Sequence, residues 1–210
     1  VDNMARVAFV YKYERIEPLG IMSLSAWVKK HGHAVEFFDV SLESNAVAAI
    51  KSFRPDVVCF SVSTGSQKFY LDFCRQLKSQ IQFVSFFGGS HPTFFPKFIE
   101  EDGVDATCTG EGEHQLLSLA SDVDGGRPIN PVLGLSVKGP SGVTISPVRY
   151  LEEDVDTFPP PDREMLMKYK PYRKMKRRSI LAGRGCPFIC QYCFNVRFNE
   201  MYQGKGKVIR

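Results

Sequence analysis

The first 120 residues alternate short apolar segments with amphipathic ones, and this alternation leaves few possible folds. Continuous apolar segments occupy residues 6–11, 34–40, 56–62, 82–89 and 105–110. Apolar side chains recur with helical spacing between and after them, at residues 21–31, 45–53, 67–79, 96–101 and 113–120. Strands that lack polar alternation are buried on both faces, as in parallel sheets covered by helices. The sequence therefore predicts a Rossmann-like α/β domain with five parallel strands flanked by helices.

Two helix ends support this prediction. His31-Gly32 suits the end of the first helix, because glycine readily adopts the left-handed conformation that follows a helix. Arg54-Pro55 suits the end of the second, because the residue before a proline disfavours helical geometry.

The loops after the strands are rich in small and polar residues. In parallel α/β sheets, ligands bind beyond the carboxyl ends of the strands. Ser61 and Ser63 offer hydroxyl groups after the third strand, and Gly88 and Gly89 allow a ligand to approach the backbone after the fourth. Neither GxGxxG nor GxxxxGK[ST] occurs, which argues against an ordinary dinucleotide or P-loop site. We expect a nucleotide-like or larger cofactor at this edge.

The chain changes character after the repeating part. Residues 132–150 alternate around Gly139 and Gly142 as a β-hairpin does, and Pro159–Pro161 favour an extended connector. Residues 167–179 then contain seven lysines and arginines, which suit a solvated linker better than a nucleic-acid site because no base-stacking aromatic platform accompanies them. We expect a Rossmann-like domain at 1–125, a hairpin and linker at 126–175, and a new βα unit that starts with a short strand, "SILA", at 176–210.

The chain has no apolar run long enough to span a bilayer and no signal-peptide pattern at its start, so we expect a cytoplasmic protein without membrane contact. Of its six cysteines, Cys59, Cys74 and Cys108 occur singly in apolar or helical contexts. Such cysteines act as small hydrophobic residues, and a chain of this kind does not need disulfides.

The other three cysteines, Cys186, Cys190 and Cys193, form a CxxxCxxC motif in a glycine-flanked loop. Zinc sites normally use four ligands, and the nearest upstream histidine, His114, lies in the first domain. Three thiolates suit a [4Fe-4S] cluster that leaves one iron open for another donor. We therefore predict an iron–sulfur site.

This motif, with aromatic Tyr192 directly before the third cysteine, resembles the signature of the radical S-adenosylmethionine superfamily. The resemblance implies that Cys186, Cys190 and Cys193 ligate the cluster and that Tyr192 lies near the adenine of S-adenosylmethionine. It implies reductive cleavage of S-adenosylmethionine, with an electron donor such as flavodoxin or ferredoxin.

The segments "PLGIMSLSAWVKKHGHAVEFFDV", "FFGGSHPTFFP", "CTGEGEHQLLSLA" and "FPPPDREML" resemble the cobalamin-binding domain and connector of B12-dependent radical S-adenosylmethionine proteins, which include methyltransferases and the anaerobic magnesium-protoporphyrin ester cyclase. The resemblance implies a flavodoxin-like sheet whose loops hold cobalamin. The implied contact positions are Ser61, Ser63, Gly88, Gly89 and Glu111. The DxHxxG motif that supplies a cobalt ligand in other B12 enzymes is absent, although His91 is a conceivable contact.

A radical S-adenosylmethionine domain resembles a partial TIM barrel, of which this sequence holds only the first strand and the cluster loop. We therefore expect a fragment of a longer enzyme, inactive alone, whose parent performs methyl transfer, rearrangement or cyclisation on an unidentified small-molecule or peptide substrate. The sequence also leaves three alternatives open. In the first, the B12-like domain binds no corrinoid. In the second, the chain is a non-catalytic corrinoid or iron–sulfur module, and in the third, residues 167–179 bind nucleic acid.

Overall fold

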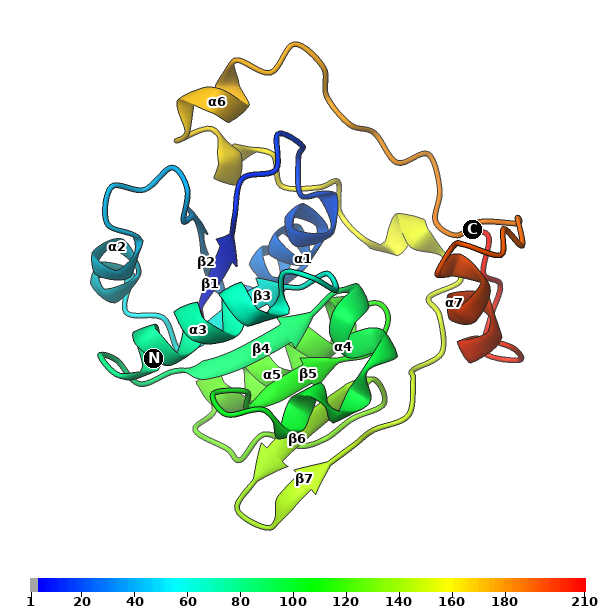
Figure 1. Ribbon diagram of the computed structural model, residues 1–210, viewed down its shortest axis with the longest axis horizontal. Helices are drawn as coiled ribbons and strands as arrows, with labels where there is room; N and C mark the ends of the chain where they lie inside the picture. Colours follow the sequence, from blue (N-terminus) through cyan, green and yellow to red (C-terminus); the bar gives the residue numbers. More distant parts are fainter. Residues whose placement is uncertain (1–3) are drawn as a thin grey trace.

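A seven-stranded sheet in the order β2-β1-β3-β4-β5-β6-β7 lies at the centre of the protein in a computed structural model that describes residues 4–210 (Figure 1). The strands are β1 (Arg6–Tyr11), β2 (Ala34–Asp39), β3 (Val57–Ser61), β4 (Val84–Gly88), β5 (Ala106–Cys108), β6 (Leu135–Gly139) and β7 (Gly142–Thr144). The first five pair in parallel, which confirms the predicted fold class for this part of the chain. Strands β6 and β7 continue the sheet in antiparallel fashion.

Helices cover both faces of the sheet. They are α1 (Leu19–Lys30), α2 (Ala46–Phe53), α3 (Gln67–Lys78), α4 (Ser90–Phe94), α5 (Glu113–Asp124), α6 (Lys170–Arg173), α7 (Asn195–Met201) and the 3-10 helices η1 (Pro96–Glu100), η2 (Val155–Thr157) and η3 (Glu164–Leu166). Within residues 4–210, none of the helices has the length and apolarity that a membrane span requires.

Two separate apolar clusters show that the sheet is buried on both sides. One cluster joins Phe9, Cys59 and Phe86 to helices α1 and α5, which pack side by side. The other joins Phe60 and Phe87 to helices α2 and α3 and to η1. Alternate residues of one strand therefore enter different clusters, which explains why each strand is apolar throughout.

Both predicted helix ends are confirmed. Helix α1 ends at Lys30, and Gly32 then adopts the left-handed region with φ of 88°. Helix α2 ends at Phe53, and Arg54 is left-handed with φ of 52° directly before Pro55. Residues that resist continued helix therefore end both segments where the sequence indicated.

Three segments differ from the sequence prediction. The predicted helix at residues 96–101 is replaced by α4 and η1, because Pro96 starts a new short turn after α4 ends at Phe94. The predicted hairpin is present, but it pairs with β5 and enlarges the five-stranded sheet to seven. The predicted strand at 179–182 does not form; Ile180 and Leu181 are largely exposed and no described strand pairs with them.

The segment that follows the prolines packs against the sheet through η3 and α6. Met165, Leu166, Tyr169 and Tyr172 join the same apolar cluster as α1 and α5. Tyr172 donates its hydroxyl hydrogen to the fully buried carboxylate of Asp39, with an O–O distance of 2.9 Å. Burial raises the pKa of Asp39 even though this hydrogen bond favours the ionised form. The Tyr172–Asp39 contact therefore ties the linker to the end of β2.

Replacing Tyr172 tests this contact. Tyr172→Phe leaves a buried carboxylate oxygen without its donor, so we expect the free energy of unfolding to fall by roughly 1–2 kcal/mol in urea denaturation. Tyr150→Phe is the matched control, because Tyr150 is exposed and its hydroxyl makes no comparable contact. Equal stability of the two variants would show that the linker is not held in this way.

Candidate functional site

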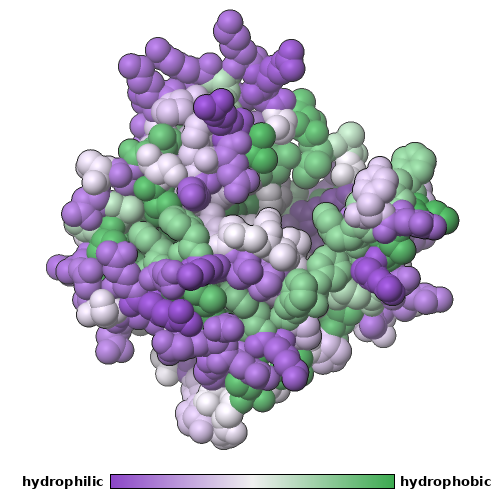
Figure 2. Space-filling model, viewed as in Figure 1, coloured by the Kyte–Doolittle hydropathy of each residue, from purple (hydrophilic) through white to green (hydrophobic). Residues whose placement is uncertain are grey.

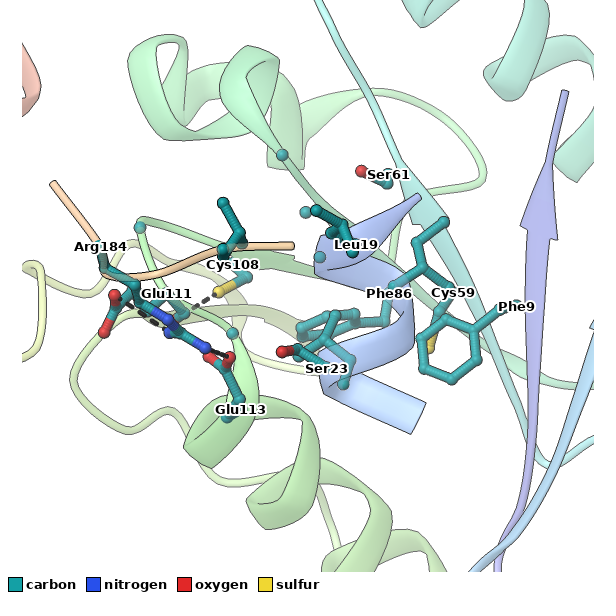
Figure 3. A pocket seen from close by; sticks show the side chains of 18 of the residues that line it. Phe9, Leu19, Ser23, Cys59, Ser61, Phe86, Cys108, Glu111, Glu113 and Arg184 are labelled. Atoms are coloured by element: carbon teal, nitrogen blue, oxygen red, sulfur yellow. Dashed lines mark hydrogen bonds and ion pairs between the residues drawn. The ribbon is translucent and has the colours of Figure 1, made fainter. Parts of the chain in front are cut away.

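A cavity of about 440 Å³ opens at the carboxyl edge of the parallel strands (Figure 3). Phe9, Cys59, Phe86 and Cys108 line it from the sheet face that α1 and α5 cover. The first turns of α1 form another wall. The volume lies in the range of small-molecule and cofactor sites, and the lining combines apolar side chains with a few polar ones. This cavity is the strongest candidate for a ligand site in the described residues.

Glycines keep the cavity open at the end of β4. A Cβ atom added at Gly88 would lie 3.8 Å from the Cβ of Cys108 and 3.9 Å from Cε1 of Phe86, both of which line the cavity. A side chain at this position would therefore occupy ligand space. Gly89 has φ of 95°, and a Cβ there would lie 2.7 Å from the carbonyl oxygen of Val62. A side chain at Gly89 would thus clash with the backbone, whereas a side chain at Gly88 would only reduce the volume of the cavity.

The structure brings four of the predicted cofactor-binding residues together and leaves two outside. Ser61, Gly88, Gly89 and Glu111 all line the cavity. Ser63 lies on the same edge but does not line it, because the chain turns away into the loop before α3.

Tyr192 is also outside the cavity, since its side chain is 93% exposed. No observation tests its predicted position beside adenine, which stays a prediction.

A buried carboxylate holds the segment that leads to the cysteines. Glu17, in the loop between β1 and α1, accepts hydrogen bonds from Arg163 at 2.8 Å, from Arg178 at 2.9 Å and from the backbone nitrogen of Ser179 at 2.8 Å. Burial alone would raise the pKa of Glu17, but these hydrogen bonds outweigh it and hold the pKa below its ordinary value. Glu17 therefore holds residues 178 and 179, where the segment that leads to the cysteines starts.

A second group of charges holds the same segment at its other end. Arg184, two residues before the first cysteine of the motif, contacts Glu113 at 2.5 Å and Glu111 at 3.1 Å (Figure 3). Burial would lower the pKa of Arg184, but the two carboxylates outweigh it and raise the pKa above its ordinary value. The guanidinium also lies 4.8 Å from the centre of the Phe158 ring. Residues 179–184 are thus held by Glu17 at one end and by Glu113 at the other. This segment crosses the cavity, and its residues Leu181 and Gly183 line it.

The sequence prediction missed Glu17, Glu113 and Arg184. Their signals were weak, because a charged residue in a loop is usually solvated. "GEGE" and "GRGC" do place single charges among glycines, which is the arrangement that allows backbone and charge to approach a partner closely.

The cysteine motif lies in a loop between residue 184 and α7. Cys186, Cys190 and Cys193 are free and partly exposed, and the backbone nitrogen of Cys193 donates to the carbonyl oxygen of Cys190 at 2.9 Å. Within residues 4–210, no group of three or more histidine, cysteine or acidic side chains is gathered as a metal-ligand set. Three thiols suit a [4Fe-4S] cluster in number and chemistry, but the described structure does not bring them together. The iron–sulfur ligands stay a prediction.

Exposed apolar side chains surround this motif, on the right of the face seen in Figure 2. They are Ile180, Leu181, Phe188, Ile189, Tyr192 and Phe194. The cysteines therefore have exposed apolar neighbours, and Cys186 also lines a small cavity of about 180 Å³.

The remaining cysteines are buried, as predicted. Burial raises the pKa of the Cys59 and Cys108 thiols and raises that of Cys74 to about 12. These thiols stay protonated at neutral pH and are unsuited to nucleophilic or ligand roles.

His91 lies in α4 and does not line the cavity. Its ring stacks on Phe95, with 4.8 Å between ring centres, and its Nδ1 lies 3.1 Å from Oγ1 of Thr64. Burial lowers the pKa of His91, so the ring is neutral at pH 7. These contacts give His91 a packing role.

The basic segment is partly neutralised within the protein. Lys168 contacts Glu36 at 2.5 Å and Glu43 at 3.7 Å, and Arg178 pairs with Glu17. Positive charges at Lys170, Lys174, Lys176 and Arg177 remain exposed. Lys168 and Arg178 therefore help to hold this segment on the domain.

Comparison with known proteins identifies the family to which the parallel-sheet domain belongs. A family model described as the B12 binding domain matches residues 6–120, which is more than half of the chain. The chain belongs to this family. The resemblance seen in the sequence is thereby confirmed, and the matched residues include all five parallel strands of the B12-binding domain.

Curated relatives extend the match beyond this domain. An uncharacterised methyltransferase of Pyrococcus horikoshii is 30% identical over an alignment that covers 89% of this chain and 42% of the relative. The anaerobic magnesium-protoporphyrin IX monomethyl ester cyclase of Rubrivivax gelatinosus is 29% identical, with coverage of 89% and 36%. The hopanoid C-3 methylase of Methylococcus capsulatus is 28% identical, with coverage of 85% and 36%. The chain thus spans about two fifths of the length of these relatives.

Solved structures share the fold. The cobalamin-dependent S-adenosylmethionine radical enzyme OxsB, with aqua-cobalamin and S-adenosylmethionine bound, matches with a TM-score of 0.74 and 22% identity over 90% of this chain and 28% of that one. The radical S-adenosylmethionine methyltransferase TsrM of Kitasatospora setae matches with a TM-score of 0.71 and 18% identity over 90% and 41%. The chain therefore shares its fold with these two radical S-adenosylmethionine enzymes, and it resembles curated methyltransferases and a cyclase in sequence.

A change at Glu17 tests the first anchor of the segment. Glu17→Gln removes a buried charge that faces two arginines, so we expect the free energy of unfolding at pH 7 to fall by roughly 2–3 kcal/mol. Because the pKa of Glu17 is lowered by folding, its stabilisation is present above the ordinary carboxylate pKa of about 4.3 and is lost as the pH falls below it. Urea denaturation at several pH values should therefore show the gap between wild type and variant closing in acid.

Glu200→Gln is the control, since Glu200 forms only an exposed pair with Arg197. A gap for Glu17→Gln that does not change with pH would contradict the role assigned to its charge.

Proposed function

We propose that this chain is the corrinoid-binding part of a radical S-adenosylmethionine enzyme that performs methyl transfer, rearrangement or cyclisation. In this proposal the nucleotide tail of cobalamin enters the cavity between the sheet and α1. The observation that supports it most is the cavity itself, which lies at the strand ends of a B12-binding domain and is crossed by the segment that leads to the CxxxCxxC motif.

The cavity suits a flat, partly apolar group. Phe9 and Phe86 offer apolar surface, while Gly88 leaves room that any larger residue would fill. Ser61 stands at the rim, exposed and able to hydrogen-bond a polar substituent. Without DxHxxG, and with His91 packed elsewhere, the described residues supply no histidine at the cavity. We therefore propose that binding rests on the tail and not on ligation of cobalt by this domain.

The protein's contribution is to place two reactive groups. When bound, cobalamin supplies a cobalt centre able to carry a methyl group, and a [4Fe-4S] cluster supplies the electron that cleaves S-adenosylmethionine. Cys186, Cys190 and Cys193 are the proposed cluster ligands, and Leu181, Gly183, Arg184 and Gly185, which precede them, line the cavity. Electrons would come from a donor such as flavodoxin or ferredoxin.

The alternative is a B12-like domain that binds no corrinoid. In that case the cavity would hold another ligand or none, and the two experiments below distinguish the cases.

Filling the cavity should weaken corrinoid binding. Gly88→Leu places a side chain beside Phe86 and Cys108, so we expect hydroxocobalamin affinity to fall roughly tenfold to a hundredfold. Gly139→Leu is the matched control, because an added Cβ there meets no atom within 4 Å and Gly139 does not line the cavity. Cobalt retained after desalting is the measurement. Equal retention by both variants would contradict the proposed site.

Anaerobic reconstitution tests the cluster separately. The chain is treated with iron, sulfide and hydroxocobalamin, desalted, and analysed for iron, cobalt and absorption. We expect Cys186→Ala, Cys190→Ala and Cys193→Ala each to lose iron and to keep cobalt, because the cysteines lie outside the cavity lining. Cys74→Ala should keep both, since its buried thiol is not a ligand. Iron that survives all three substitutions would refute the assigned ligands.

A further inference from the structure

One short loop separates the cofactor cavity from the cysteine motif. Residues 110–113, "GEGE", connect β5 to α5, and all four line the 440 Å³ cavity. Glu111 also lines a second cavity of about 180 Å³, to which Cys186 belongs. Arg184 and Gly185 line both cavities as well. The two cavities therefore share three lining residues, namely Glu111 of the 110–113 loop and Arg184 and Gly185 just before the cysteines.

The chain before the cysteines is fixed to this loop by charge. Arg184 contacts the carboxylates of Glu111 and Glu113, and the side chain of Glu113 is only 6% exposed. An ion pair so little exposed to water is strongly directional and weakly screened by salt. A displacement of the loop is therefore transmitted to Arg184.

The chain after the cysteines reaches the same loop. Arg210 contacts Glu111 at 2.6 Å, and its side chain is 3% exposed. The hydroxyl of Tyr202, directly after α7, accepts a hydrogen bond from the backbone nitrogen of Glu111 at 3.4 Å. A Cβ at Gly110 would collide with that hydroxyl, so glycine permits the contact. Residues 184–210, here called the cysteine segment, therefore contact residues 110–113 at both of their ends.

The two ends also pair with each other. The backbone of Arg184 donates to and accepts from the backbone of Arg210, at 2.9 Å and 3.0 Å. A Cβ at Gly185 would lie 1.8 Å from the carbonyl oxygen of Val208, so the backbone at residue 185 lies very close to the backbone at residue 208. The cysteine segment therefore forms a closed loop, and the two paired ends of this loop contact the 110–113 loop.

We propose that the 110–113 loop couples the occupancy of the larger cavity to the order of the cysteine segment, with Arg184 as the positioning residue. The inference rests on the proposed function, because the occupant is a corrinoid. A ligand that packs against residues 110–113 restricts them, and the cysteine segment then loses less conformational freedom when it adopts the arrangement its cofactor needs. Because such coupling is reciprocal, an ordered cysteine segment also strengthens corrinoid binding.

Amide hydrogen–deuterium exchange with cyanocobalamin as the probe tests the coupling without requiring activity or a cluster. In the wild-type chain we expect saturating cyanocobalamin to slow exchange both in peptides that contain residues 110–113 and in peptides from 184–210. Because Arg184 lines the larger cavity, Arg184→Met is compared at a cyanocobalamin concentration that saturates the variant. The slowing near 110–113 should persist there, while the ligand-dependent slowing of 184–210 should fall at least about fivefold.

Two further variants and a control complete the test. Arg210→Met removes the other arginine without altering the lining of the larger cavity and should weaken the same protection. Arg184→Lys keeps the charge but cannot reach both carboxylates with a planar fork, so it should restore protection in part. Arg197→Met removes only an exposed pair and should behave as wild type. A merely stabilising role would lower the unfolding midpoint of the arginine variants and leave the ligand-dependent protection intact.

The outcomes separate the two proposals. Wild-type chain that retains no cyanocobalamin overturns the proposed corrinoid function and the coupling with it. Retained cyanocobalamin that protects residues 110–113 but leaves 184–210 unchanged overturns the coupling alone. Loss of distal protection in Arg184→Met, with corrinoid still bound, supports it.

Discussion

The parallel pairing of β1 to β5 determines where this protein can act. Parallel strands run in one direction, so every loop that follows a strand reaches the same edge of the sheet. The order β2-β1-β3-β4-β5 places the ends of β3, β4 and β5 next to one another. Helices α1 and α5 cover one face, and the space between α1 and the strand ends becomes the cavity. The strand order therefore determines the position of the site, whichever side chains line it.

Carboxylates at that edge, of which Glu17 and Glu113 are buried, hold later parts of the chain. Glu17, Glu111 and Glu113 follow β1 or β5, and each meets an arginine from beyond residue 160. Such charges are costly to bury singly, but here each has a partner of opposite charge. Glu17 and Glu111 each contact two arginines, and Glu113 pairs with Arg184. The same edge therefore forms the cavity and orients the segment that contains the cysteines.

The sequence indicated those parts of the structure that local patterns determine. Apolar runs and helical spacing located β1 to β5, α1, α2, α3 and α5, because burial on two faces leaves a periodic signature. Ser61, Gly88, Gly89 and Glu111 were selected from the strand ends and from the family resemblance, and all four line the cavity, while their contact with a cofactor stays a prediction. Contacts between distant residues left no comparable signal. Arg184 and Glu113 are 71 positions apart, and the pairing of the hairpin with β5 depends on tertiary packing.

The proposed function requires that the cavity at the strand ends receives the nucleotide tail of a corrinoid. A crystal structure of the chain grown with hydroxocobalamin would show whether it does. We expect electron density for the tail between Phe9, Phe86 and the first turns of α1, with Gly88 in contact with it. A corrinoid bound elsewhere on the protein, or a cavity that contains only water at saturating hydroxocobalamin, would overturn the proposed site.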